Sequence, residues 1–103
     1  MKNDEQHIMR LLMHEKPVGI ILGLKGTEGK YASILAKETD CTYTHTLKIL
    51  DIFHKYGLVE FEKEGRIKRV VLTEKGGDIA HELEGLVRHL EKVSAEEENE
   101  ESK

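Results

Sequence analysis

Apolar residues recur at helical spacing along most of the chain and alternate with polar residues in only one region. Near the start, Ile8, Leu11 and Leu12 share one helix face, which predicts a helix over residues 4–15. Two methionines beside this stripe blur it, so a strand is the alternative for this segment. The pattern as a whole predicts a mainly helical chain.

Two short helices are expected next. The apolar run over residues 18–24 fits a buried strand or a buried helix, and Pro17 favours the helix because its missing N–H costs nothing in a first turn. A Gly-rich connector over residues 26–30 leads to a second helix over residues 31–39. The inward side chains of that second helix would be Ala32, Ile34 and Leu35.

A longer helix is predicted over residues 43–56. Before it, Asp40, Cys41 and Thr42 break the helical pattern, because short polar side chains prefer helix caps. After it, Gly57 suits the left-handed position that follows a helix. The core side of this helix would consist of Thr46, Ile49, Leu50 and Phe53.

The strict alternation begins directly afterwards and predicts a β-hairpin. Residues 58–63 alternate apolar and polar side chains, and residues 66–72 are rich in β-branched ones. Glu64 and Gly65 between them fit a two-residue turn. The hairpin would have a charged tip.

The last segment has the most regular apolar period. Thr73 can cap a helix that runs to about Val93. Its apolar residues follow at intervals of four and three, as in a coiled-coil seam, although two heptads are fewer than a coiled coil normally needs. The stripe can pack on its own domain or on a second copy, and we favour a homodimer because so small a domain already has a core. The expected interface residues are Ile79, Leu83, Leu86, Leu90 and Val93.

Acidic residues gather at the C-terminal end. The 103 residues carry a net charge of −4, but residues 94–103 hold five of the 20 acidic side chains and one of the 16 basic ones, so the remainder is neutral. Such a tail cannot bury apolar surface and is expected to be disordered. The chain therefore divides into a domain of residues 1–73, a helix of residues 74–93 and a tail of residues 94–103.

The composition limits the class of protein. No apolar run reaches the ~20 residues of a membrane span, and no secretory leader pattern is visible. A single cysteine cannot form an internal disulfide, which fits a reducing compartment. We expect a cytoplasmic protein that does not bind membranes.

Catalysis and metal binding are not expected. Six scattered histidines form no catalytic dyad, so the sequence predicts no enzyme, no catalytic residues and no cofactor. Cys41 lies close to His45 in sequence, but zinc needs three or four converging ligands. His81 and His89 are separated by about 12 Å of helix rise, too far to share one ion. No metal site is expected, and metal or thiol sensing is kept only as a minor alternative.

The order of helix, helix, tight break, helix, hairpin and long helix is that of a winged helix-turn-helix. The chain resembles transcription regulators of the multiple-antibiotic-resistance-regulator (MarR) type and their small archaeal relatives. The resemblance rests on residues 34–76, where "LAKE", "HKYGLVEFEKEGR" and "LTEKG" match the second helix and the two junctions of the wing. It implies an α+β, mostly helical fold with a three-helix core, a β-hairpin wing and a long C-terminal dimerisation helix.

The residue chemistry agrees with double-stranded DNA as the partner. Hydroxyl, imidazole and ammonium groups at the start of the third helix can meet base edges or phosphates in the major groove, and bases on the wing can contact the flanking backbone. The expected DNA-binding residues are Thr42, Tyr43, Thr44, His45, Lys48, Lys63, Arg66 and Lys68, with Arg69 as a further candidate.

We therefore predict a homodimeric regulator that reads a DNA sequence and acts mainly as a repressor, because the chain has no room for an activation domain. Its operator and any small-molecule effector are left open. The alternative is a winged-helix module that binds protein, since Glu60, Glu62 and Glu64 alternate with the bases of the wing and weaken its positive charge.

Overall fold

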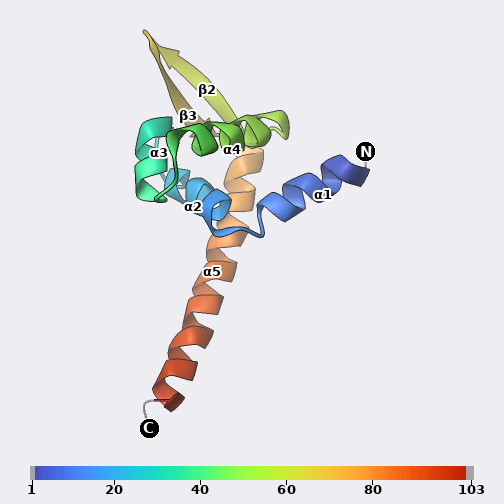
Figure 1. Cartoon of the computed structure of the whole chain (residues 1–103), viewed down its shortest axis with the longest axis vertical. Coiled ribbons are helices and arrows are strands. Elements are labelled where there is room, and N and C mark those ends of the chain that lie inside the picture. The colour runs from blue at the N-terminus through green and yellow to red at the C-terminus, as the bar shows by residue number, and fades with distance from the viewer. Residues whose placement is uncertain (1, 102–103) are drawn as a thin grey trace.

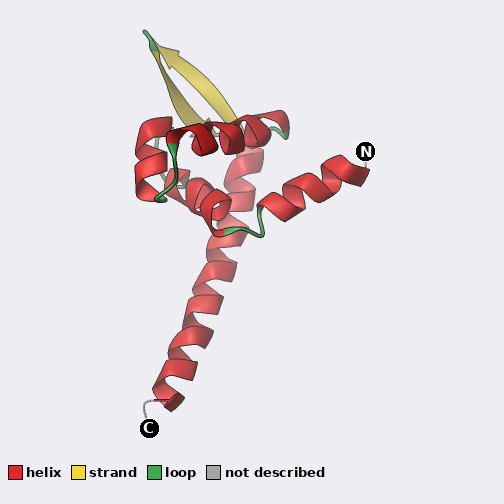
Figure 2. Ribbon diagram, in the orientation of Figure 1, coloured by secondary structure: helices red, strands yellow, loops and turns green. Residues whose placement is uncertain are grey.

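The structure is a computed structural model that describes the backbone of residues 2–101 and the side chains of residues 7–97. Five helices and three short strands make up the described chain, as Figures 1 and 2 show. The α+β, mostly helical prediction is confirmed. In chain order the elements are α1 (Lys2–Leu11), α2 (Glu15–Leu24), β1 (Lys30–Tyr31), α3 (Ala32–Glu38), α4 (Tyr43–Lys55), β2 (Val59–Glu64), β3 (Ile67–Leu72) and α5 (Glu74–Glu101).

The core lies where α2, α3 and α4 meet the base of the hairpin and the start of α5. The four residues predicted for the inner side of α4 are all buried, because they recur at three- and four-residue intervals on one face. On α3 the prediction is wrong for Ile34, whose side chain is 44% exposed. The buried stripe of α3 is Ala32, Leu35 and Ala36, and Ile34 lies beside it.

The N-terminal segment is helical, but it is divided earlier than predicted. Helix α1 ends at Leu11 and α2 begins at Glu15, so the predicted helix over residues 4–15 is really the first helix plus a turn. Pro17 is the third residue of α2 and still lies in the first turn, where an N–H has no helical partner.

The three strands form one antiparallel sheet in the order β1-β3-β2. Strand β1 was not predicted, because two residues are too few to show an alternating pattern. The hairpin is confirmed, but its turn lies one residue later than expected. Glu64 pairs with Ile67, which leaves Gly65 and Arg66 as the turn residues, with Gly65 in the left-handed region at φ 60°.

Helix α5 begins as predicted and ends later. The Thr73 hydroxyl oxygen accepts a hydrogen bond from the Gly76 N–H at 3.0 Å, as a cap does. The helix then projects from the body and continues to Glu101 (Figure 1). Residues 94–101, for which the sequence predicts a disordered tail, continue α5 in this structure, and residues 102–103 lie outside the described part. Exposed Glu and Ala residues extend an existing helix at little cost, because only nucleation is unfavourable.

The junctions on either side of the hairpin are locked together. The Thr73 N–H donates to the Leu58 carbonyl at 3.0 Å, and the Thr73 hydroxyl donates to the Gly57 carbonyl at 2.5 Å. Gly76 passes so close that a Cβ atom there would lie 1.9 Å from the Leu58 carbonyl oxygen. The root of the hairpin and the start of α5 thus form one rigid joint.

Candidate nucleic-acid interface

The turn between α3 and α4 is built by backbone hydrogen bonds. Helix α3 ends with Asp40 in the left-handed conformation at φ 53°. The N–H groups of Cys41 and Asp40 donate back to the Ala36 and Lys37 carbonyls at 2.9 and 3.3 Å, the pattern of a Schellman motif. These bonds orient α4 against α3 as a helix-turn-helix.

Helix α4 starts at a side-chain cap. Thr42 occupies the cap position, and its hydroxyl oxygen accepts the His45 backbone N–H at 3.1 Å. Of the predicted DNA contacts, Thr42 is therefore already engaged within the protein, and its hydroxyl proton and second lone pair are what remain for a ligand. The free N–H groups of the first turn and the positive end of the helix dipole lie at the same place.

The remaining predicted residues of α4 face solvent. Thr44 and Lys48 lie opposite the buried stripe, because each is two residues, roughly half a turn, away from the buried Thr46. Tyr43 and His45 are exposed on either side of them. The outer surface of α4 thus presents hydroxyl, imidazole and ammonium groups together.

Two further residues on this surface were missed in the sequence. Leu47 is 38% exposed and lies outside the buried stripe of α4. An exposed leucine can contact the methyl group of thymine in a major groove. Asp51 lies one turn beyond Leu47 and is also exposed, which places a negative charge at the far end of this surface.

The hairpin has two chemically different faces. Lys63 and Lys68 are directly opposite each other across the two strands and share a face with Phe61. The Lys68 ammonium lies 5.7 Å from the centre of the Phe61 ring, a cation–π distance. Glu62 and Glu64 point to the other face, because side chains alternate along a strand.

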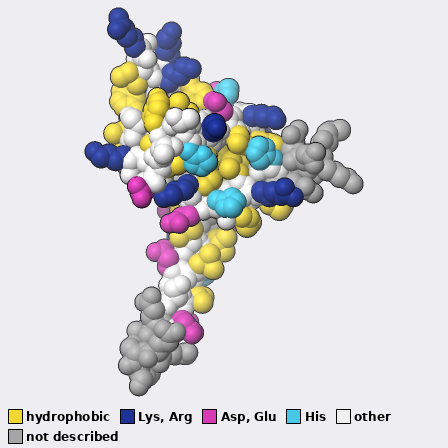
Figure 3. Space-filling model, viewed as in Figure 1, with side chains coloured by type: hydrophobic (Ala, Val, Ile, Leu, Met, Phe, Trp, Pro, Cys, Tyr) yellow, Lys and Arg dark blue, Asp and Glu magenta, His cyan; other side chains and the backbone are white. Residues whose placement is uncertain are grey.

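This separation resolves the mixed charge of the hairpin sequence. Acidic and basic side chains that follow one another along β2 point to opposite faces of the hairpin. The positive charge of the basic side chains is therefore not cancelled by their sequence neighbours. Arg66 is exposed in the turn and adds a third positive charge. Figure 3 shows Lys and Arg side chains gathered at the tip of the hairpin.

Arg69 lies on the acidic face and is neutralised there. Its Nη2 atom is 2.9 Å from Glu62 Oε1 and 3.3 Å from Glu64 Oε1. The hydrogen bond to Glu62 and the charge of Glu64 raise the pKa of Arg69. The Tyr31 hydroxyl donates to Glu64 Oε2 at 3.1 Å. Arg69 is therefore separated from Lys63, Arg66 and Lys68, the three basic residues at the tip of the hairpin.

The predicted dimer residues fall into two groups along α5. Ile79 and Leu83 are half-buried and pack against the core of their own chain. Leu86, Leu90 and Val93 are 53%, 56% and 61% exposed. The apolar stripe therefore packs within the domain at its start and is open to solvent further along, as Figure 3 shows.

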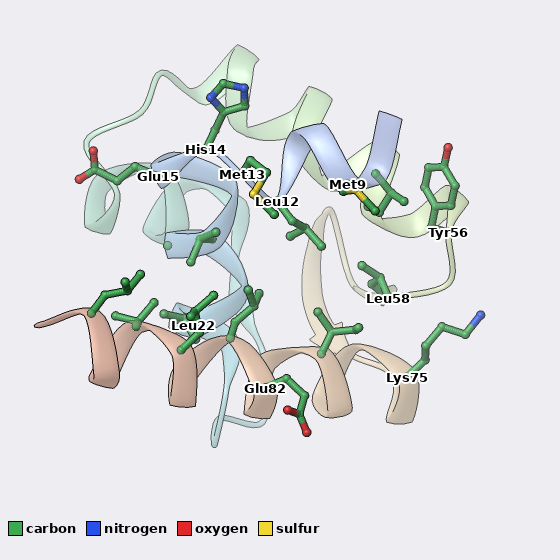
Figure 4. Close-up of a pocket in the computed structure, with 18 residues that line it drawn as sticks. Met9, Leu12, Met13, His14, Glu15, Leu22, Tyr56, Leu58, Lys75 and Glu82 are labelled. Atoms are coloured by element: carbon green, nitrogen blue, oxygen red, sulfur yellow. The ribbon is translucent and has the colours of Figure 1, made fainter. Parts of the chain in front are cut away.

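A groove of about 970 Å³ lies between α1, α2 and the exposed part of α5. Its walls are mainly apolar, and Figure 4 shows Met9 and Leu12 facing α5 across it. Leu86 and Leu90 belong to its lining. The groove and the exposed stripe form one continuous apolar surface.

The described side chains bring no three His, Cys, Asp or Glu residues together at one point. Cys41 is half-buried against the core, and His81 and His89 are exposed on α5. No helix in residues 2–101 is both long and apolar enough to cross a membrane.

Comparison with known proteins places these features in a wider group. No family model matches the chain. An uncharacterized protein of Archaeoglobus fulgidus is 28% identical over 91 residues, which span 84% of this chain and 96% of that protein. The crystal structure of AF1382 from Archaeoglobus fulgidus is also 28% identical, with a TM-score of 0.72 over 81% of this chain and 96% of that chain.

The structure of the MarR family transcriptional regulator SPO1453 from Silicibacter pomeroyi is similar as well. It is 24% identical, with a TM-score of 0.72 over 84% of this chain and 63% of that chain. The resemblance drawn from the junction motifs is confirmed at the level of the fold, since both chains share the helices, the hairpin and the long C-terminal helix. This chain therefore has a MarR-like winged helix-turn-helix fold.

Proposed function

We propose that the protein is a transcriptional regulator that binds a specific sequence of double-stranded DNA as a homodimer, without catalysis. Helix α4 of each subunit enters the major groove, and the hairpin lies on the flanking backbone. The two half-sites are about one helical turn, ~34–36 Å, apart. In this proposal the protein regulates by occupying a promoter, mainly as a repressor.

One observation carries this proposal: the polar outer surface of α4 and the basic side chains of the hairpin are both exposed to solvent. Lys63 and Lys68 stand opposite each other, although like charges in such a pair repel. A repulsive pair on an exposed hairpin gains from an anion that lies across it. A DNA backbone supplies such anions, and base contacts by α4 supply the sequence preference.

The homodimer rests on the apolar surface formed by the groove and the exposed stripe of α5. Leu86 and Leu90 are more than half exposed at successive turns, and a contiguous apolar patch of this kind marks an interaction surface. The molecule is also extended, with a radius of gyration of 15.3 Å, whereas a compact chain of this length has about 13 Å. A second copy that packs its own α1 and α5 against this surface would bury it.

The test is fluorescence anisotropy of a labelled duplex from upstream of the gene, titrated at several salt concentrations beside a scrambled duplex. We expect tighter binding to the upstream duplex and a steep salt dependence. Arg66→Ala should reduce the magnitude of the salt slope by about 1 per bound subunit, whereas Lys48→Ala should also lower the preference for the upstream duplex. Lys92→Ala is the control, because Lys92 is exposed on α5 far from the hairpin.

Each outcome decides between functions. Equal binding to both duplexes would contradict sequence-specific reading and leave a nonspecific DNA binder. No binding at low salt would overturn the proposal in favour of the protein-binding module. Loss of binding only in the presence of a metal chelator would instead support a metal-sensing variant.

A further inference from the structure

We propose that Tyr31 is a positioning residue that sets the angle of the wing relative to the helix-turn-helix, through Glu64 and Arg69. These residues, with Glu62, are here called the wing clamp. They come from all three strands of the sheet. The inference rests on the proposed function, because a fixed wing matters only if the wing contacts DNA.

The position of Tyr31 in the chain makes it suited to this task. Tyr31 is the last residue of β1 and also the N-cap of α3, so it joins the sheet directly to the first helix of the helix-turn-helix. Its hydroxyl reaches Glu64, the last residue of β2, at 3.1 Å. One side chain thus connects the DNA-reading helices to the far end of the wing.

The far end of the wing needs such a connection. Strand β1 pairs with Val70 and Arg69 and goes no further, so the pairs Lys63–Lys68 and Glu64–Ile67 have only two strands. A two-stranded hairpin is only marginally stable in water. Ile67 is 52% exposed, so little apolar packing holds this part of the hairpin. Side-chain contacts from β1 are therefore what fixes its direction.

Arg69 completes the clamp. It is paired directly with Tyr31 on one side and with Glu62 on the other. Its guanidinium bridges Glu62 and Glu64 at 2.9 and 3.3 Å, and Glu64 in turn accepts the Tyr31 hydroxyl. Glu64 is thus held by two donors, Arg69 from the adjacent strand β3 and Tyr31 from β1 beyond it. The acidic face of the hairpin aligns the wing, while the basic face remains available for phosphate.

The test is Tyr31→Phe, which removes only the hydroxyl group. We expect DNA affinity to fall about three- to tenfold with an unchanged melting temperature, because the hydroxyl is at the surface. The effect of Arg66→Ala should shrink in the Tyr31→Phe background, since a misdirected wing no longer delivers Arg66 to the DNA.

Two substitutions of glutamate serve as controls. Glu64→Gln should reduce DNA affinity less than Tyr31→Phe does, because the amide oxygen still accepts the Tyr31 proton. Glu60→Gln, on the same face but outside the clamp, should have no effect. Additive effects of Tyr31→Phe and Arg66→Ala would overturn the proposal.

A second readout needs no DNA and separates the clamp from the proposed function. Amide hydrogen exchange over residues 63–68 of the free protein should accelerate at least threefold in Tyr31→Phe, with unchanged exchange in the buried part of α4. If the wild-type protein binds no duplex but exchange accelerates in Tyr31→Phe, the proposed function is wrong and the wing clamp is supported. Unchanged exchange would overturn the clamp in either case.

The tyrosine itself provides a third check. The hydrogen bond to Glu64 and then its negative charge raise the pKa of Tyr31 above its usual value. The raised pKa means that the bond is intact at neutral pH and is lost only as the pH rises through this higher value. In an alkaline absorbance titration, Glu64→Gln should therefore lower the pH at which one tyrosine ionises. An unchanged titration curve would contradict the contact.

Discussion

At the residue scale, the clearest constraint in the molecule is the glycine at the start of α5. The sequence suggests that Gly76 weakens the helix, because glycine has a low helix propensity. The structure gives the opposite reason for its presence. The helix passes directly over the Leu58 carbonyl, and no larger residue fits between them.

This constraint leads to a matched pair of variants. Gly76→Ala should lower the free energy of unfolding by about 2 kcal/mol or more, because its Cβ would overlap a backbone carbonyl that cannot move alone. Gly77→Ala should instead raise it by up to about 1 kcal/mol, since nothing lies within 4 Å of the added atom. Urea unfolding at one fixed protein concentration measures both. Equal effects at the two positions would contradict the tight joint.

At the element scale, the helix-turn-helix depends on how α3 ends. Asp40 has a positive φ of 53°, a conformation that glycine adopts freely and that costs other residues free energy. Aspartate tolerates it better than most residues. The chain thus keeps a strained residue at the turn that orients α4.

Asp40→Gly should relieve this strain, but glycine also gives the unfolded chain more conformational entropy, which favours unfolding. The net result should be an increase in the free energy of unfolding by about 0.5 kcal/mol. Asp40→Ala should lower the free energy of unfolding by about 0.5–1 kcal/mol, because alanine has no polar side chain to offset the cost of the left-handed conformation. Thermal or urea unfolding checks the order Gly, Asp, Ala. Reversal of that order would mean that the Asp40 side chain stabilises the turn by a contact of its own.

The elements also explain how far the sequence could predict the structure. Helices with several turns and the hairpin repeat their pattern often enough to be recognised, and the core of α4 was predicted residue by residue. Strand β1 was missed, since its two residues are defined only by their partners in β3. The hydrogen bond from Tyr31 to Glu64 could not be predicted for the same reason, because it joins residues 33 positions apart. The ion pair of Arg69 with Glu62 depends on the exact register of the hairpin, whose turn lies one residue later than predicted.

At the scale of the whole molecule, the proposed homodimer depends on the exposed part of α5. We expect light scattering to give twice the mass of one chain at micromolar concentration. Leu86→Glu combined with Leu90→Glu should produce monomers, because two charges would be buried in the apolar surface. DNA affinity should then fall at least tenfold, since each half-site would be bound separately.

Arg88→Glu is the control for this variant. It changes the net charge by the same amount, but Arg88 is 72% exposed on the opposite side of α5. It should remain dimeric. A wild-type protein that stays monomeric at micromolar concentration would contradict the proposed assembly, as would a dimer that survives both leucine substitutions.

Because α5 is long and fixed at the joint around Gly76, a small rotation at that joint produces a large displacement at its far end. A helix of 28 residues is about 42 Å long, so a tilt of five degrees at its root would move its far end by about 3.7 Å. In a pair of chains joined along α5, the same tilt changes the distance between the two α4 helices. Successive major grooves accept only a narrow range of that distance. The clearance beneath one glycine would thereby set the spacing of the DNA sequence that the pair can read.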